Sequence, residues 1–143
     1  MADAPDVARL LHDFQTEYEE PVPELEVLTE RVREFIERGE ATFLLAGDGP
    51  DGFAEIRLRP SLLTGALDAY LEEFYVAPAT RGQGLGRALL EAAMDVARRQ
   101  GAIRMDLGTS EDDEAARHLY ESAGFTNRER PDGPVMFVYE RDL

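Results

Sequence analysis

Several residue types are absent from this chain or scarce in it, and each absence excludes a kind of chemistry. The 143 residues include no cysteine, no lysine and only two histidines, His12 and His118. Without cysteine the protein cannot form disulfides, use a thiolate nucleophile or bind a metal through sulfur. This absence fits a cytoplasmic protein, and the cytoplasm is the localisation that we expect. Because the two histidines lie far apart in the sequence, we expect no metal site.

Long apolar runs are also missing. No stretch approaches the ~20 apolar residues that a membrane-spanning helix needs. Residues 1–6 lack the basic and apolar segments of a secretory signal peptide. A chain of this length usually forms one domain and can bury about two thirds of its unfolded surface. The sequence therefore predicts a single domain over residues 1–143, with no membrane partner.

Basic residues are few, since 30 acidic residues outnumber 15 arginines and the formal net charge is −15. Binding to nucleic acid depends on basic side chains that contact phosphates, so nucleic acid is not an expected partner. A cationic substrate such as an amine would be attracted, although an acidic surface can equally serve solubility alone. An anionic cofactor would need a local group of hydrogen-bond donors.

Apolar residues recur at helical spacing in some segments, and they alternate or cluster as in strands in others. Apolar and charged residues alternate within residues 54–59, so we expect one face of that strand to be exposed. The predicted helices are residues 7–18, 25–39, 85–100 and 114–123. The predicted strands are residues 42–46, 54–59, 69–76, 103–108, 125–130 and 135–140.

A glycine-rich turn between the third strand and the third helix is the most informative segment. Such a turn presents backbone N–H groups that have no intrahelical partner, and together with the helix dipole they can bind a phosphate or diphosphate. The glycines allow close approach of the backbone, and the arginines can add forked donors. The candidate anion-binding residues are Arg81, Gly82, Gln83, Gly84, Leu85, Gly86 and Arg87.

The spacing within this turn excludes two common nucleotide loops. A dinucleotide fingerprint needs glycine at the sixth position from Gly82, but that residue is Arg87. A Walker loop needs lysine, which the chain lacks. The pattern Arg-x-x-Gly-x-Gly between a strand and a helix instead resembles the pyrophosphate loop of the GNAT superfamily of N-acetyltransferases, which binds acetyl-coenzyme A. The alternative is an ordinary glycine-rich turn.

A second segment, residues 113–125, is similar to another GNAT signature, Asn-x-x-Ala-x-x-Leu-Tyr-x-x-x-Gly-Phe. Asp113 departs from that pattern, because asparagine is commoner there, but it could still cap a helix. The family also usually opens with a strand, whereas this chain opens with a helix. The residues that match are Ala116, Leu119, Tyr120, Gly124 and Phe125.

The resemblance implies a mixed α/β (α+β) fold. A mostly antiparallel central sheet would be splayed at the cofactor cleft, between residues 69–76 and 103–108, with helices on both faces. The implied reaction transfers the acetyl group of acetyl-coenzyme A directly to a primary amine of a small molecule. Homodimers are common in the family, so a second copy of the chain is among the implied partners.

The resemblance also implies which residues hold the cofactor besides the glycine turn. The pantetheine arm would pair with the backbone of Phe74, Tyr75 and Val76, where one N–H would polarise the thioester carbonyl. Asp113 and Ala116, at the start of the last helix, would complete the cofactor site.

Tyr120 is the candidate acid for the leaving thiolate, because a phenol is protonated at neutral pH. Residues 71–76 resemble the Leu-Glu-Asp-Phe-Tyr-Val segment of spermidine/spermine N-acetyltransferases, whose first acidic residue is the proposed base. That residue maps onto Glu72. Strand alternation sends Glu72 and Glu73 to opposite faces unless a bulge intervenes. The residues that we expect near the amine are Glu73, Glu17 and Asp13.

Two other functions stay open from the sequence. The acceptor could be an amino group of a protein, which a wide neutral groove would favour over a deep acidic pocket. The chain could also be a regulatory module that binds acyl-coenzyme A without catalysis. The presence of both Tyr120 and the glycine turn favours an enzyme.

Overall fold

Helices α1 (Ala4–Glu17) and α2 (Leu25–Glu37) open the chain, close to where the apolar spacing predicts them. The computed structural model describes residues 3–143. Val7 and Val32, one from each helix, are buried in a cluster that also contains Phe53 of the sheet. The two helices therefore cover one face of the sheet.

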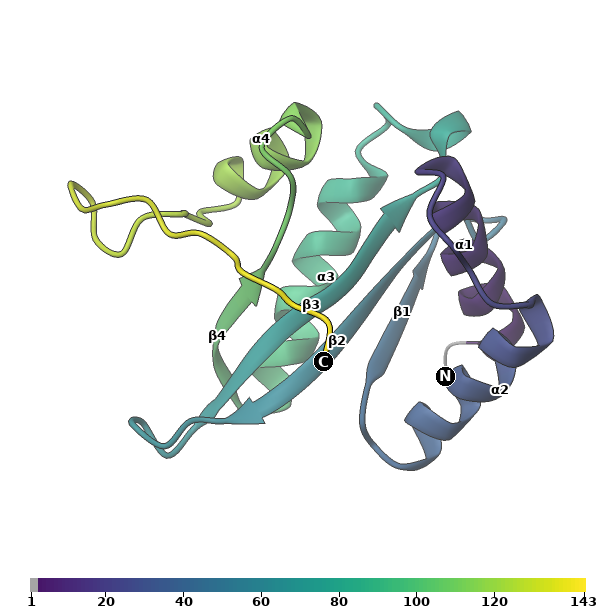
Figure 1. Ribbon diagram of the computed structural model, residues 1–143, viewed down its shortest axis with the longest axis horizontal. Helices are drawn as coiled ribbons and strands as arrows, with labels where there is room; N and C mark the ends of the chain where they lie inside the picture. Colours follow the sequence, from purple (N-terminus) through teal and green to yellow (C-terminus); the bar gives the residue numbers. More distant parts are fainter. Residues whose placement is uncertain (1–2) are drawn as a thin grey trace. The chain divides into compact units, whose positions relative to one another are not determined.

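Four strands form one mixed sheet in the order β1-β2-β3-β4. The first two pairings are antiparallel and the last is parallel. Helix α3 (Leu85–Arg99) connects β3 to β4, because a parallel pair needs a crossover connection (Figure 1). The strands are β1 (Thr42–Ala46), β2 (Gly52–Pro60), β3 (Leu67–Val76) and β4 (Ala102–Leu107).

Helix α3 packs on the opposite face from α1 and α2. A Cβ on Gly52 would lie 3.5 Å from Cδ2 of Leu89 in α3. Because side chains alternate along a strand, Phe53 points to the other face, where it joins the cluster of α1 and α2. The predicted mixed α/β fold with helices on both faces is confirmed.

Helix α4 (Glu114–Ser122) begins at an acidic cap. The Asp113 carboxylate accepts a hydrogen bond from the Ala116 N–H at 3.1 Å. Tyr120 is buried, and its ring lies 6.0 Å from that of Phe125 in an edge-on arrangement. The capping role that the sequence allows for Asp113 is therefore present.

The predicted C-terminal strands at residues 125–130 and 135–140 do not form a ladder. A single bridge joins Arg128 and Val135, and the side chains of Phe137 and Tyr139 are 74% and 87% exposed. Pro131 lies between the two segments, and a hairpin of two strands alone is marginally stable in water. The β-forming residues are therefore present without the neighbouring strand that would stabilise them.

The described residues form two compact units, one that ends at Leu107 and one that begins at Gly108. The single domain expected from the sequence stays a prediction, and each unit is described by itself. No helix within residues 3–143 is both long enough and apolar enough to cross a membrane.

Candidate active site

The last part of β3 has an open edge. Pairing between β3 and β4 runs from Leu67 and ends where Leu71 lies opposite Leu107. Residues 72–76 continue β3 but pair only with β2 among the described strands. An extended ligand could therefore add to this edge as a further strand. Pairing stops there because β4 itself ends at Leu107, so the predicted divergence of the two strands stays a prediction.

The glycine turn leads from this strand into α3 (Figure 1). Gly82 and Gly84 have φ angles of +77° and +83°, which favour glycine, and beyond their chain neighbours no atom lies within 4 Å of where a Cβ would be. The Ala88 N–H donates to the Gly84 carbonyl at 3.1 Å, the first hydrogen bond of the helix. The N–H groups of Leu85 and Gly86 precede it and have no acceptor among residues 3–143. Such a helix start can bind an anion.

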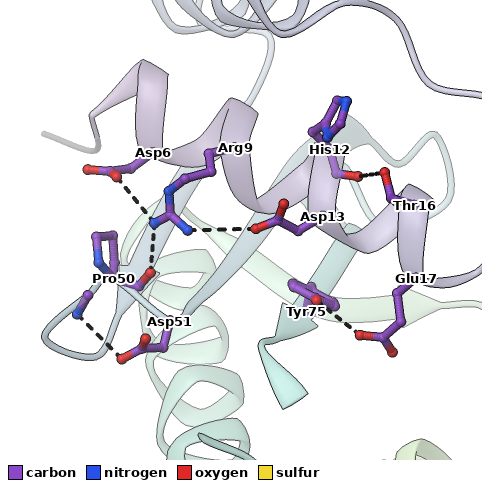
Figure 2. Close-up of polar contacts among 10 residues, drawn as sticks. Asp6, Arg9, His12, Asp13, Thr16, Glu17, Pro50, Asp51 and Tyr75 are labelled. Carbon is purple, nitrogen blue, oxygen red and sulfur yellow. Dashed lines mark hydrogen bonds and ion pairs between the residues drawn. The ribbon is translucent and has the colours of Figure 1, made fainter. Parts of the chain in front are cut away.

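The Arg81 guanidinium is held by helix α1 and strand β3. Its Nη2 lies 3.0 and 2.9 Å from the two carboxylate oxygens of Glu17, and its Nε donates to the Val76 carbonyl at 2.9 Å. The Tyr75 hydroxyl donates to the same Glu17 carboxylate at 3.1 Å, as Figure 2 shows. Arg81 therefore ties the turn to α1 and β3, and the assignment of its fork to a phosphate stays a prediction.

Both carboxylates of α1 that the sequence places near the amine have basic partners. Glu17 is paired with Arg81, and Asp13 lies 3.7 Å from Nη1 of Arg9 (Figure 2). Burial, together with the hydrogen bond to Glu17, raises the pKa of Tyr75 to about 12. This end of β3 is thus a neutralised network of α1 and the turn.

A β-bulge interrupts β3 at Glu72. Glu55 of β2 lies opposite Glu73, but the next residue of β2, Ile56, lies opposite Leu71. One residue of β3, Glu72, therefore has no counterpart on β2, and the alternation of side chains shifts there by one position.

The bulge brings three carboxylates to one face. Glu55 and Arg57 alternate along β2 and share a face, so their opposite residues Glu73 and Tyr70 lie on that face too. Glu72 lines the same cavity as Tyr70 and Arg57. The sequence predicts that Glu72 and Glu73 lie on opposite faces unless a bulge intervenes. The bulge is present, so the two side chains share a face.

These carboxylates have unequal electrostatic surroundings. Burial, then the negative charges of Glu55 and Glu72, raise the pKa of Glu73 to about 7, and the charge of Arg57 only partly opposes them. Burial also raises the pKa of Glu55, but Arg57 counters it by a hydrogen bond from Nε to Oε1 at 2.9 Å. Glu73 is therefore a group that exchanges a proton near neutral pH.

A cavity of about 550 Å³ adjoins the bulge at Glu72. Its wall includes the Tyr70 ring, over which the Arg59 guanidinium lies at 5.5 Å. Arg59 also pairs with Asp106 at 2.7 Å. The residues that line the cavity are Gly39, Glu40, Ala41, Thr42, Ile56, Arg57, Leu58, Arg59, Tyr70 and Glu72.

Tyr120 holds its proton firmly. Burial, and to a smaller extent the negative charge of Asp113, raise the pKa of its phenol to about 12. The phenol therefore stays a neutral hydrogen-bond donor throughout the physiological range.

Comparison with known proteins assigns the family. Residues 7–125 match the Acetyltransferase (GNAT) family. The matched part includes the glycine turn, the bulge and the helix of Tyr120. This chain belongs to the GNAT family. It is an acetyltransferase, as the sequence patterns indicate, and GNAT acetyltransferases use acetyl-coenzyme A as co-substrate.

Relatives of this GNAT protein are acetyltransferases with different names. The aminoglycoside N(6′)-acetyltransferase type 1 of Stenotrophomonas maltophilia is 32% identical over 90% of this chain and 84% of its own length. The mycothiol acetyltransferase of Beutenbergia cavernae is 45% identical over 41% of this chain, which spans only 21% of that protein. A solved acetyltransferase structure from Arthrobacter sp. FB24 has a TM-score of 0.90 and 38% identity over 99% of this chain and 90% of its own.

Three residues near the bulge of this GNAT protein are absent from the sequence-based prediction. They are Glu55, Arg57 and Tyr70. The charged residues of β2 read as an exposed strand face, but only 6% of Glu55 is exposed, because α1 and α2 pack on that side. In the sequence, Glu55 alternates with apolar residues, which marks it as a strand residue. The sequence does not say which face of the strand α1 and α2 will cover, so the burial of Glu55 could not be predicted.

Proposed function

We propose that this GNAT protein transfers the acetyl group of acetyl-coenzyme A to a primary amine of a small molecule. The observation that carries the proposal is the group of carboxylates at the bulge of β3, beside the open edge of the same strand. A thioester bound along that edge would place its carbonyl near groups that attract and deprotonate an ammonium.

The cofactor is assigned to the backbone more than to side chains. The turn residues 82–87 would bind the diphosphate through N–H groups at the start of α3, where the helix dipole also favours an anion. Residues 74–76 would pair with the pantetheine arm on the open edge. Arg81 is left out of this set, because its Nη2 pairs with Glu17 and its Nε donates to the Val76 carbonyl.

Glu73 is the base in this proposal, in place of Glu72. A base works best when its pKa lies near the working pH, and the pKa of Glu73 is about 7. Its carboxylate would take one proton from the substrate ammonium. The freed amine nitrogen would bond to the thioester carbonyl carbon, and the carbon–sulfur bond would then break.

Glu72 and the cavity are assigned to the acceptor. Glu72 is exposed and has no ion pair among the described residues, so its charge is available to a cation. Asp13 and Glu17, which lie on α1 and are paired with arginines, would contribute only to the general negative field. An amine with more than one cationic group, such as an aminoglycoside, suits this surface.

Tyr120 is proposed to donate a hydrogen bond to the leaving thiolate. A thiol has a pKa of about 8.5, so a phenol at about 12 stabilises the thiolate as a donor without losing its own proton fully. The second proton of the original ammonium would finally neutralise the sulfur. Asp113 and Ala116, which are hydrogen-bonded to each other, would orient the helix that carries Tyr120.

Two measurements test this proposal. Calorimetry should detect binding of acetyl-coenzyme A, and Gly84→Asp should abolish that binding by placing a side chain and a negative charge in the turn. Thiol release should be measured with a panel of amines that includes aminoglycosides with a 6′-amino group. Tyr120→Phe should lower turnover far more than cofactor affinity. Absence of acetyl-coenzyme A binding in the unaltered protein would end the proposal.

A further inference from the structure

We propose that Glu55 is a positioning residue, which holds a fixed negative charge opposite Glu73 and thereby keeps Glu73 able to accept a proton from the substrate. This inference rests on the proposed function, in which Glu73 is the base. It adds a residue of β2 to a reaction that the proposed function assigns to β3, α3 and α4.

The register places the two side chains against each other. Glu55 and Glu73 are opposite residues of antiparallel strands, so their Cβ atoms lie about 4.5–5.5 Å apart and on the same face. Like charges in that arrangement are unfavourable unless one group binds a proton. Only 6% of Glu55 is exposed, so solvent screens its charge poorly.

Arg57 decides which carboxyl of the pair keeps the negative charge. Its Nε donates to Glu55 Oε1 at 2.9 Å, and its guanidinium lies 4.8 Å over the Phe35 ring of α2. The side chain of Glu73 has no hydrogen bond or ion pair to any residue from 3 to 143, although its backbone pairs with β2. A charge-assisted hydrogen bond stabilises the ionised form, so we infer that Glu55 keeps the negative charge in preference to Glu73.

Other groups around Glu73 do not replace this pairing. From β3, Glu72 adds a second negative charge, but that side chain is exposed and its effect is screened. From α2, the contact to Arg57 is the uncharged Phe35. From α1, Glu17 and Asp13 act on Tyr75, two residues along β3, and both are paired with arginines.

The test compares proton binding with turnover in the same variants. Glu55→Gln keeps the shape and an acceptor oxygen for Arg57 but removes the charge. Carboxyl-selective NMR of ¹³C-glutamate protein, assigned with Glu73→Gln, follows the titration of Glu73 without substrate. The pH dependence of kcat/KM is then measured with acetyl-coenzyme A and kanamycin A, or with the best amine of the panel if kanamycin A is not acetylated. Asp68→Asn, on β3 but outside the carboxylate group, is the control.

We expect the Glu73 titration in Glu55→Gln to move to lower pH by about one unit, since a neighbouring like charge is removed. The acidic limb of kcat/KM should move by the same amount. Glu55→Asp retains the charge, so it should restore a profile close to that of the unaltered protein, which a purely structural role would not produce. Asp68→Asn should leave both curves in place.

Two outcomes separate the claims. If the Glu73 titration is unchanged in folded Glu55→Gln protein, the coupling between the two carboxyls is refuted. If the titration moves but the kcat/KM profile does not, the coupling stands while Glu73 as the base, and with it the positioning role of Glu55, is refuted. If Glu55→Gln does not fold, the same two curves from Glu55→Asp decide, because loss of the neutral-pH titration despite the retained charge would contradict the inference.

Discussion

Carboxylates near the two ends of residues 72–76 of β3 have opposite electrostatic surroundings. At the carboxyl end, Glu17 receives hydrogen bonds from both Tyr75 and Arg81. The bulge has three carboxylates, those of Glu55, Glu72 and Glu73. Arg57 is the one arginine whose charge lowers the pKa of Glu73. A carboxylate with its own basic partner, such as Glu17, therefore has a structural role, whereas Glu73, without one, can exchange a proton.

The largest expected effect comes from removing the proton acceptor. Glu73→Gln should lower kcat by about 10²–10⁴-fold, as is typical for loss of a general base. Glu17→Gln, at the neutralised end, should have little effect on kcat. The measurement is steady-state thiol release at saturating acetyl-coenzyme A. Equal losses in the two variants would erase the distinction between the two ends.

Stability should change in the reverse sense to activity. Folding raises the pKa of Glu73 from 4.5 to about 7. The contribution of Glu73 to the free energy of unfolding is therefore fully present below pH 4.5 and is lost as the pH rises through about 7. Glu73→Gln should therefore stabilise the protein by on the order of 2 kcal/mol at about pH 8, and hardly at all at about pH 4.5. Urea denaturation at the two pH values measures this. A destabilised variant at the higher pH would contradict the assigned titration.

Removing the ion pair between Arg81 and Glu17 should lower the stability of the protein without lowering its affinity for the cofactor. Arg81→Met removes the ion pair between Nη2 and Glu17 and should destabilise the protein by about 1 kcal/mol, because the pair is partly exposed. Affinity for acetyl-coenzyme A should stay close to that of the unaltered protein in calorimetry. A large loss of affinity in folded Arg81→Met would return Arg81 to the diphosphate site.

The smallest effect is expected at the exposed carboxylate of the bulge. Glu72→Gln should raise KM for a multiply charged amine by about threefold at low salt, and by less at high salt, because exposed charges are screened. The change in kcat should be much smaller than in Glu73→Gln. A kcat loss in Glu72→Gln as large as that of Glu73→Gln would favour Glu72 as the base.

The fold and the glycine turn were predictable because they depend on local patterns. The spacing of apolar residues places α1, α2 and α3 within a few residues of their observed ends. Gly82 and Gly84 adopt left-handed angles that glycine takes readily, so a turn between a strand and a helix can be predicted from the sequence alone. The bulge is not legible in this way, since it arises from how β2 and β3 align.

The C-terminal segment illustrates the limit of local patterns. Val135 and Phe137 belong to a run of residues that favours strands. The run is nevertheless exposed, and it forms a single bridge instead of a ladder. A strand is stabilised by its neighbours, which lie elsewhere in the chain or outside it. Propensity alone therefore predicted an element that the structure does not form.

By itself the sequence determined the family, the order of the helices and strands up to α4, and the glycine turn at the start of α3, because each follows from short-range spacing and backbone chemistry. Only the tertiary structure decided which carboxylates are neutralised and which compete for a proton. Glu55 and Glu73 are brought together by strand register, and Glu17 and Arg81 by the packing of α1 against β3. Charge interactions depend on distance and burial in three dimensions, which no spacing along the chain records.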